Sequence, residues 1–338
     1  MINKLKKPRA ANSADTPHKR SAQEGRFTFK HVFFGRDKIP APTLLIISLV
    51  LLVLFKIAIS AFPDKIGGYL GVVILLTVIF FIPTYLYYRF TKRGRLSSVL
   101  NELKIKLPKI NHIFLLFFGA VFISVCVFYL NLLFRLREGY TYGFYLYNTF
   151  FTGKLPIPDT PLYPIIAFAL VPAMCEEFMF RGIFHASYEK QGFMSAAITS
   201  AVMFALVSLD LRTLISNFAL GLFLSFILYL TKSLVSCFIV NFLFKCFMLF
   251  FGTNLQSYIL SSSNKAVFFA ATIGAMLLSL AIFAFECAKI FKQNSKGEYA
   301  LPRLTAPTKK VCFERTASNL STVSMAICVI VFIVAIFI

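Results

Sequence analysis

Three ionisable side chains, Glu176, Glu177 and Arg181, lie inside an otherwise apolar stretch that runs from about Leu162 to Phe184. An ionised side chain near the centre of a bilayer is costly, so such residues inside a membrane segment are rare and are expected to pair with one another or to serve a function. These three residues are therefore the first candidates for a functional site.

The spacing of the three residues suggests different roles for the two carboxylates. On a helix, Glu177 and Arg181 are four residues apart and share a face, whereas Glu176 points to a neighbouring face. An ion pair between Glu177 and Arg181 would reduce the cost of burial and leave Glu176 to act as a general base on a trapped water. The alternative is that all three side chains only hold helices together through polar contacts.

The composition predicts that these residues lie in a polytopic membrane protein. Of the 338 residues 58% are apolar and only 14% are charged, and the mean hydropathy is +0.76. The net charge is +21, and the basic residues that produce it lie between the apolar runs. This placement favours membrane lipids as partners and argues against nucleic acid. The seven cysteines form no CxxC pair, so neither a disulfide framework nor a zinc site is expected.

The apolar runs predict an all-α bundle of about nine transmembrane helices, since a helix needs roughly 20 residues to cross the hydrocarbon. Very short turns are expected at Asp210–Arg212 and at Lys232. The predicted spans are 41–62, 68–88, 112–134, 162–185, 192–209, 213–231, 233–251, 266–288 and 320–338.

The distribution of basic residues predicts the orientation. With a cytoplasmic N-terminus, the inside segments hold 26 Lys and Arg residues and the outside loops hold six. A helix that lies in the cytoplasmic interface is expected at residues 95–107, where apolar residues recur at helical spacing opposite bases. His185, near the cytoplasmic end of its span, is expected at the interface.

The stretch Glu176-Glu177-Phe178-Met179-Phe180-Arg181 resembles the EExxxR motif of the CPBP family, which comprises CAAX prenyl proteases and bacteriocin-processing or self-immunity (Abi) proteins. The resemblance continues through three later spans and covers about residues 160–252. Its further elements are Phe204-Ala205-Leu206-Val207-Ser208, then Phe218-Ala219-Leu220-Gly221, then Ser233-Leu234 leading to Asn241-Phe242-Leu243-Phe244-Lys245.

The chain departs from the family pattern at three positions. Ser208 and Asn241 stand where the family has histidines, and Lys245 stands where it has Asn or Asp. The resemblance implies that Glu176 is the catalytic base and that Glu177 and Arg181 support it. With Ser208 and Asn241 as the other donors, only one good metal ligand remains, so neither a metal nor another cofactor is expected.

Lys245 suggests a degenerate site. If its span packs as in the family, its ammonium group lies near Glu176, and two positive charges then meet two negative ones. An ion-paired carboxylate is a poorer general base. The sequence therefore leads to the hypothesis that Lys245 has taken over the stabilisation of Glu176.

The resemblance and the composition together suggest six regions and one principal function. The function is that of a CPBP-type intramembrane endopeptidase-like protein of a bacterial plasma membrane, weakly active or inactive, with a peptide or membrane protein as substrate or partner. The alternative is a non-catalytic scaffold or regulator that binds a peptide or partner helix in the same cavity.

The regions are a basic cytoplasmic arm (1–38), N-terminal spans with the interfacial helix (39–158), a CPBP-like core (159–252), an accessory span (253–292), a basic cytoplasmic linker (293–319) and a C-terminal anchor (320–338).

Overall fold

The computed structural model describes residues 41–61, 69–92, 104–136, 162–252, 265–296 and 309–337. Every regular element within these ranges is a helix. The prediction of an all-α, multi-pass membrane protein is confirmed, whereas the basic arm at 1–38 lies outside the described residues.

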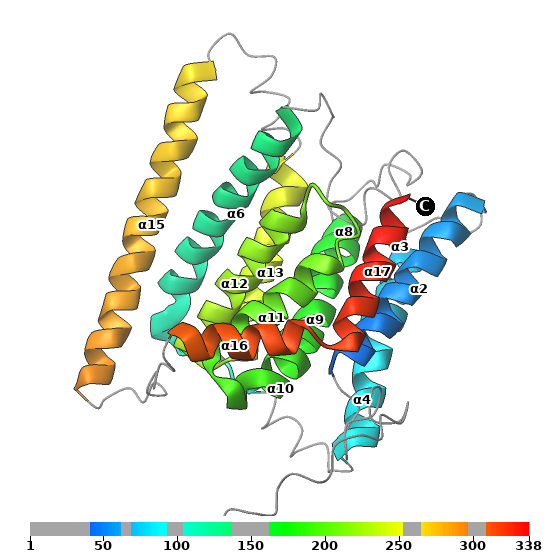
Figure 1. Cartoon of the computed structure of the whole chain (residues 1–338). Coiled ribbons are helices and arrows are strands. Elements are labelled where there is room, and N and C mark those ends of the chain that lie inside the picture. The colour runs from blue at the N-terminus through cyan, green and yellow to red at the C-terminus, as the bar shows by residue number, and fades with distance from the viewer. Residues whose placement is uncertain are drawn as a thin grey trace, which may run out of the picture.

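A central group of helices contains the EExxxR motif and its framework. It consists of α9 (Val171–Glu177), the π-helix η4 (Phe178–His185), α11 (Phe193–Leu206), α12 (Leu214–Thr231) and α13 (Leu234–Phe247). These segments lie in the middle of the bundle (Figure 1). They are apolar nearly all round because they are enclosed by other helices or by lipid.

Two outer groups flank this centre (Figure 1). On one side lies α6 (Ile113–Leu136), which packs against α15 (Lys265–Ser295) at the edge of the bundle. On the other side α2 (Ala41–Ala61) packs against α17 (Val323–Phe337). The first and last described helices therefore lie side by side, away from α15.

The remaining helical elements are short and mostly continue the longer ones. They are α3 (Tyr69–Leu76), η1 (Thr77–Phe81), α4 (Ile82–Lys92), η2 (Ile110–His112), α8 (Leu162–Pro164), η3 (Ile165–Leu170), α10 (Ala186–Tyr188), η5 (Glu189–Gln191), η6 (Met248–Gly252) and α16 (Lys309–Leu320).

Wide π-helical turns interrupt the span that contains the motif. The π-helix η3 ends two residues before Pro172, near the start of α9, and η1 in another span ends two residues before Pro83. Proline has no N–H and its ring crowds the preceding turn, so the wider turn relieves the contact while the helix continues. The motif therefore lies in a span whose winding departs from 3.6 residues per turn.

Five described helices are long and apolar enough to cross a membrane, and a sixth results if α16 and α17 are one bent span. Three shorter apolar helices cover Pro42–Ala58, Val73–Tyr87 and Phe193–Leu206. Each of the nine predicted spans contains helix in the structure. The count of nine crossings and the cytoplasmic N-terminus stay predictions.

The structure corrects the end of the helix predicted at residues 95–107. Residues 104–109 are not helical, because Lys104 adopts a left-handed conformation (φ 54°) and the chain then runs extended. Residues 95–103 lie outside the described ranges.

The basic linker at 293–319 contains α16, which packs on α11 and meets α17 at 65°. Asn319 donates to Ser195 Oγ at 3.2 Å, so polar contacts hold this helix in place.

The two short turns predicted around α12 are present. Before α12, Asp210 Oδ1 accepts from the Arg212 amide at 2.9 Å, which closes a tight turn. After α12, Lys232 adopts the left-handed conformation (φ 52°) that ends many helices, and the Ser233 side chain accepts from the Ser236 amide to cap α13. These turns bring α11, α12 and α13 side by side.

Candidate active site within the membrane

The three motif side chains lie at the junction of α9 and η4 and are fully enclosed. Relative exposures are 3% for Glu176, 1% for Glu177 and 2% for Arg181. Consecutive carboxylates on a helix point in different directions, so each meets a different partner. Glu176 and Glu177 therefore have different ion-pair partners.

Arg181 pairs with Glu177, as their spacing predicts. Its Nη1 lies 3.0 Å from Glu177 Oε1, and its Nη2 donates to the Gly221 carbonyl at 3.1 Å. The guanidinium also lies over the Phe204 ring, 4.7 Å from the ring centroid. These contacts replace much of the hydration that the guanidinium loses on burial and join η4 to α11 and α12.

Glu176 pairs with a residue of a different helix. Lys245 Nζ lies 3.0 Å from Glu176 Oε1, and the two side chains are 2% and 4% exposed. Lys245 comes from the last turn of α13, which packs directly against α9. The second ion pair therefore holds two spans together.

Asn241 connects the two carboxylates. Its Nδ2 donates to Glu176 Oε2 at 3.2 Å and to Glu177 Oε1 at 2.8 Å. With both amide protons directed at carboxylates, the Asn241 oxygen faces away from the negative charge, which is the orientation that electrostatics favours. Asn241 lies one turn before Lys245 on α13, so the same face of that helix supplies both contacts.

The five residues form a charge-balanced cluster with two carboxylates, one guanidinium, one ammonium and one neutral amide. In a low-dielectric interior, paired charges with hydrogen bonds cost far less than isolated ones, and removing one partner leaves an uncompensated charge. The cluster can therefore persist in the membrane and can fix the packing of α9 and η4 against α11, α12 and α13.

Ser208, the sixth candidate residue, makes different contacts. Its hydroxyl lies 2.8 Å from the Ala205 carbonyl and 3.2 Å from the Asp210 carbonyl, at the end of α11. The next residue, Leu209, has φ 48°, so the chain turns away here. The structure thus brings together five of the six candidates and uses the Ser208 hydroxyl to close a turn.

Two framework residues, Gly221 and Phe204, also contribute to the site. A Cβ at Gly221 would lie 2.9 Å from the Ala201 Cα, so only glycine allows α12 to approach α11 this closely. The Gly221 carbonyl then accepts from Arg181, and the Phe204 ring lies under the same guanidinium. The motifs containing these residues marked them in the sequence, but their contact with Arg181 depends on helix packing.

His185 is buried, not interfacial as the sequence suggested. It is 2% exposed, and its ring lies 5.7 Å from that of Phe193. The short α10 and η5 and the start of α11 cover the end of its span. His185 is therefore enclosed by protein on the side that was expected to face headgroups.

The cluster does not suit a metal ion. Among the residues that the structure describes, no three His, Cys, Asp or Glu side chains converge as metal ligands would. Glu176 and Glu177 each face a cationic side chain at 3.0 Å. A divalent cation would have to lie beside Lys245 and Arg181, which both repel it.

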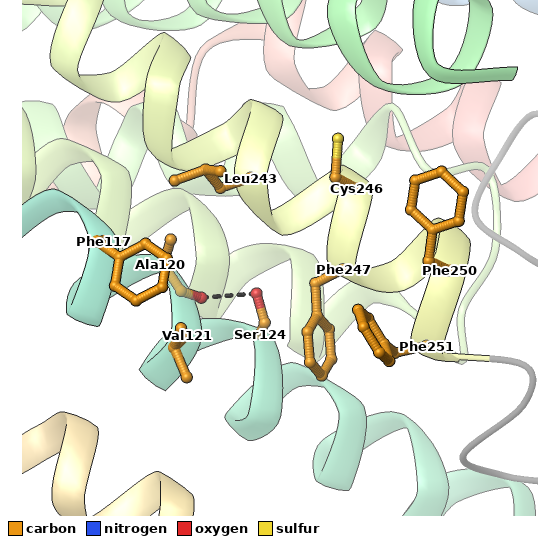
Figure 2. A pocket seen from close by; sticks show the side chains of 9 residues that line it. All are labelled: Phe117, Ala120, Val121, Ser124, Leu243, Cys246, Phe247, Phe250 and Phe251. Atoms are coloured by element: carbon orange, nitrogen blue, oxygen red, sulfur yellow. Dashed lines mark hydrogen bonds between the residues drawn. The ribbon is translucent and has the colours of Figure 1, made fainter. Parts of the chain in front are cut away.

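An apolar cavity of about 270 Å³ lies on the other side of α13, between that helix and α6 (Figure 2). The Ser124 hydroxyl in its wall donates to the Ala120 carbonyl at 2.6 Å, so it is satisfied within its own helix. The cavity suits apolar groups better than water. Its lining is Phe117, Ala120, Val121, Ser124, Leu243, Cys246, Phe247, Phe250 and Phe251.

The helical fold and the apolar spans define a multi-pass membrane protein, and this protein buries a polar cluster at the EExxxR motif. Residues 158–247 match the family model described as Rce1-like, Type II CAAX prenyl endopeptidase Rce1-like. The resemblance to the CPBP family is thereby confirmed over a segment that contains all six candidate residues. Neither a curated protein nor a solved structure gives a match.

Proposed function

We propose that this chain is a CPBP-type intramembrane protease-like protein in which the carboxylate cluster has a mainly structural role, so that proteolysis is weak or absent. The observation that supports this proposal most is the 3.0 Å contact between Lys245 Nζ and Glu176 Oε1. A general base needs an oxygen directed at the water it activates. Here Lys245 faces one Glu176 oxygen and Asn241 donates to the other.

The donors that an oxyanion would need are also engaged. Both Nδ2 contacts of Asn241 go to carboxylates, and the Ser208 hydroxyl is directed at backbone carbonyls. Loss of one oxyanion donor typically lowers the rate by about a hundred- to a thousandfold. Engagement of both donors, with an ion-paired base, supports a low or negligible turnover.

The alternative, a non-catalytic scaffold or regulator, is supported by the same direct contact between Lys245 and Glu176. A partner peptide or helix would then be bound without being cleaved. A bacterial plasma membrane remains part of this proposal, because the basic residues between apolar runs suit a membrane with anionic lipids.

A cleavage assay tests the proposal. The full-length chain in lipid nanodiscs is incubated with a farnesylated CAAX peptide, the substrate class that the family description names. The matched control is Glu176→Gln/Lys245→Met, which removes the carboxylate and its cation together and leaves the cluster neutral. We expect wild type and control to release the same background amount of product. Cleavage by wild type that the control lacks would overturn the proposal.

A gain-of-function variant sharpens this assay. Ser208→His/Asn241→His/Lys245→Asn restores the residues that the family pattern has at these positions. We expect this variant to cleave the peptide above the wild-type level and to lose that activity when Glu176→Gln is added. Co-purification from native membranes distinguishes the alternative, because a scaffold retains a stoichiometric partner without producing fragments.

A further inference from the structure

The chain before α6 crosses directly over the turn between α12 and α13. The Lys104 carbonyl accepts from the Leu234 amide at 3.0 Å, and the Lys106 carbonyl accepts from the Ser233 hydroxyl. Lys106 N also donates to the Lys104 carbonyl at 2.8 Å. The extended segment 104–109 is therefore fixed to the turn by its backbone, which leaves its side chains to face outward.

This arrangement gathers four lysines, Lys104, Lys106, Lys109 and Lys232, at one place. Burial lowers the pKa of Lys232, and the nearby ammonium groups of Lys104, Lys106 and Lys109 lower it further. Lys104 forms an ion pair with Glu189 at 2.5 Å. The ammonium groups of these four lysines act on one another, so the place carries a positive field that attracts anions.

Exposed aliphatic side chains alternate with these lysines. Leu107 is 85% exposed and Ile110 is 78% exposed. Both lie where α6 begins, level with the end of α12 at Thr231 and the start of α13 at Leu234. Ends of membrane-spanning helices lie at the headgroup layer, so these side chains are at the boundary between headgroups and acyl chains.

We propose that Lys106, Lys109 and Lys232 bind the phosphate of an anionic phospholipid while Leu107 and Ile110 insert among its acyl chains. The charge of the lysines selects the phosphate, and the exposed aliphatic residues select a lipid over a soluble anion. An acidic protein segment would not explain why apolar side chains stand in the same row. The proposal does not depend on whether the carboxylate cluster is catalytic.

Lipid exchange on the full-length chain tests this site. The purified protein in a neutral detergent is given equal amounts of phosphatidylglycerol and phosphatidylcholine, and native mass spectrometry measures the ratio of the bound lipids. The site variant is Lys106→Gln/Lys109→Gln/Lys232→Gln. The control, Lys292→Gln/Lys309→Gln/Lys310→Gln, loses the same charge from exposed positions on α15 and α16.

We expect wild type and control to prefer phosphatidylglycerol and the site variant to lose that preference by about fivefold or more. An unchanged preference in the site variant, or an equal loss in the control, would overturn the proposal. If the triple variant is unstable, Lys106→Gln and Lys109→Gln alone, both at exposed positions, should each lose part of the preference.

Two further arms identify the source of the phosphate. Inorganic phosphate at millimolar concentration should not displace the bound phosphatidylglycerol, and displacement would indicate a site for a soluble anion instead. Leu107→Ser/Ile110→Ser keeps every lysine and should weaken retention of phosphatidylglycerol. Retention equal to that of wild type would contradict the role of these two residues.

Discussion

Lys245 and Glu176 are separated by 69 positions in the sequence, yet Lys245 Nζ lies 3.0 Å from Glu176 Oε1 inside the bundle. The contact links the last turn of α13 to the end of α9, and Asn241 links the same two helices one turn earlier. Together they occupy the carboxylate that the family resemblance identifies as a base.

Removal of Lys245 should destabilise the fold. Lys245→Met leaves Glu176 as an uncompensated buried carboxylate, and breaking a buried pair in this way costs about 3–5 kcal/mol. The double variant Glu176→Gln/Lys245→Met should recover most of that loss. Denaturant titration of the purified chain in detergent measures both effects. A double variant as unstable as Lys245→Met would show that the pair is not the source of the cost.

Asn241→Asp tests the bridge between the carboxylates. The substitution keeps the shape of the side chain but replaces two donated hydrogen bonds with a third carboxylate beside Glu176 and Glu177. Loss of hydrogen bonds to charged groups alone costs about 1.5–3 kcal/mol each, and the added repulsion increases the loss. Thermal unfolding at neutral pH should show a large drop for Asn241→Asp. A midpoint within one degree of wild type would be incompatible with the bridging role.

Two glycines in different helices provide a matched comparison. Gly221→Ala places a methyl group 2.9 Å from the Ala201 backbone, so α11 and α12 must separate and Arg181 loses its contact with the Gly221 carbonyl. Gly274→Ala in α15 meets nothing within 4 Å. We expect Gly221→Ala to lower the unfolding midpoint and Gly274→Ala to raise stability by about 0.5–1 kcal/mol. Equal effects would argue against the close helix approach.

Lys232 gives a dependence on pH. Because its pKa is lowered in the folded chain, the unfolded chain holds this proton more strongly, and the charged side chain destabilises the fold at neutral pH. That destabilisation disappears as the pH rises from the folded pKa toward the unfolded value of about 10.4. Lys232→Gln should therefore be more stable than wild type at pH 7 in neutral detergent and low salt, with a difference that shrinks by pH 10. A difference independent of pH would contradict this origin.

Local spacing was sufficient to predict the pair of Glu177 and Arg181, because residues four apart on one helix are neighbours whatever surrounds them. The proximity of Lys245 to Glu176 required the family framework, since no local pattern relates α13 to α9. The bridge by Asn241 was not predicted, because the sequence places its Cβ on a face but does not fix where its amide protons point.

The sequence was less informative where the backbone departs from regular winding. Ser208 was expected among the site residues, but a left-handed turn at Leu209 directs its hydroxyl to backbone carbonyls. The interfacial helix predicted up to Leu107 fails at Lys104 for a similar reason, because backbone contacts with the α12–α13 turn replace helical hydrogen bonds. Apolar periodicity does not detect either kind of turn.

The central question is whether Glu176 performs proteolysis in its own membrane. The direct measurement is quantitative membrane proteomics of cells that carry either wild type or Glu176→Gln/Lys245→Met at matched abundance. The double variant removes the carboxylate without leaving an unpaired ammonium group. We predict that no uncleaved precursor accumulates in the variant cells. Accumulation of a precursor that wild-type cells process would show that Glu176 is an active catalytic base and would contradict the structural role proposed for Lys245.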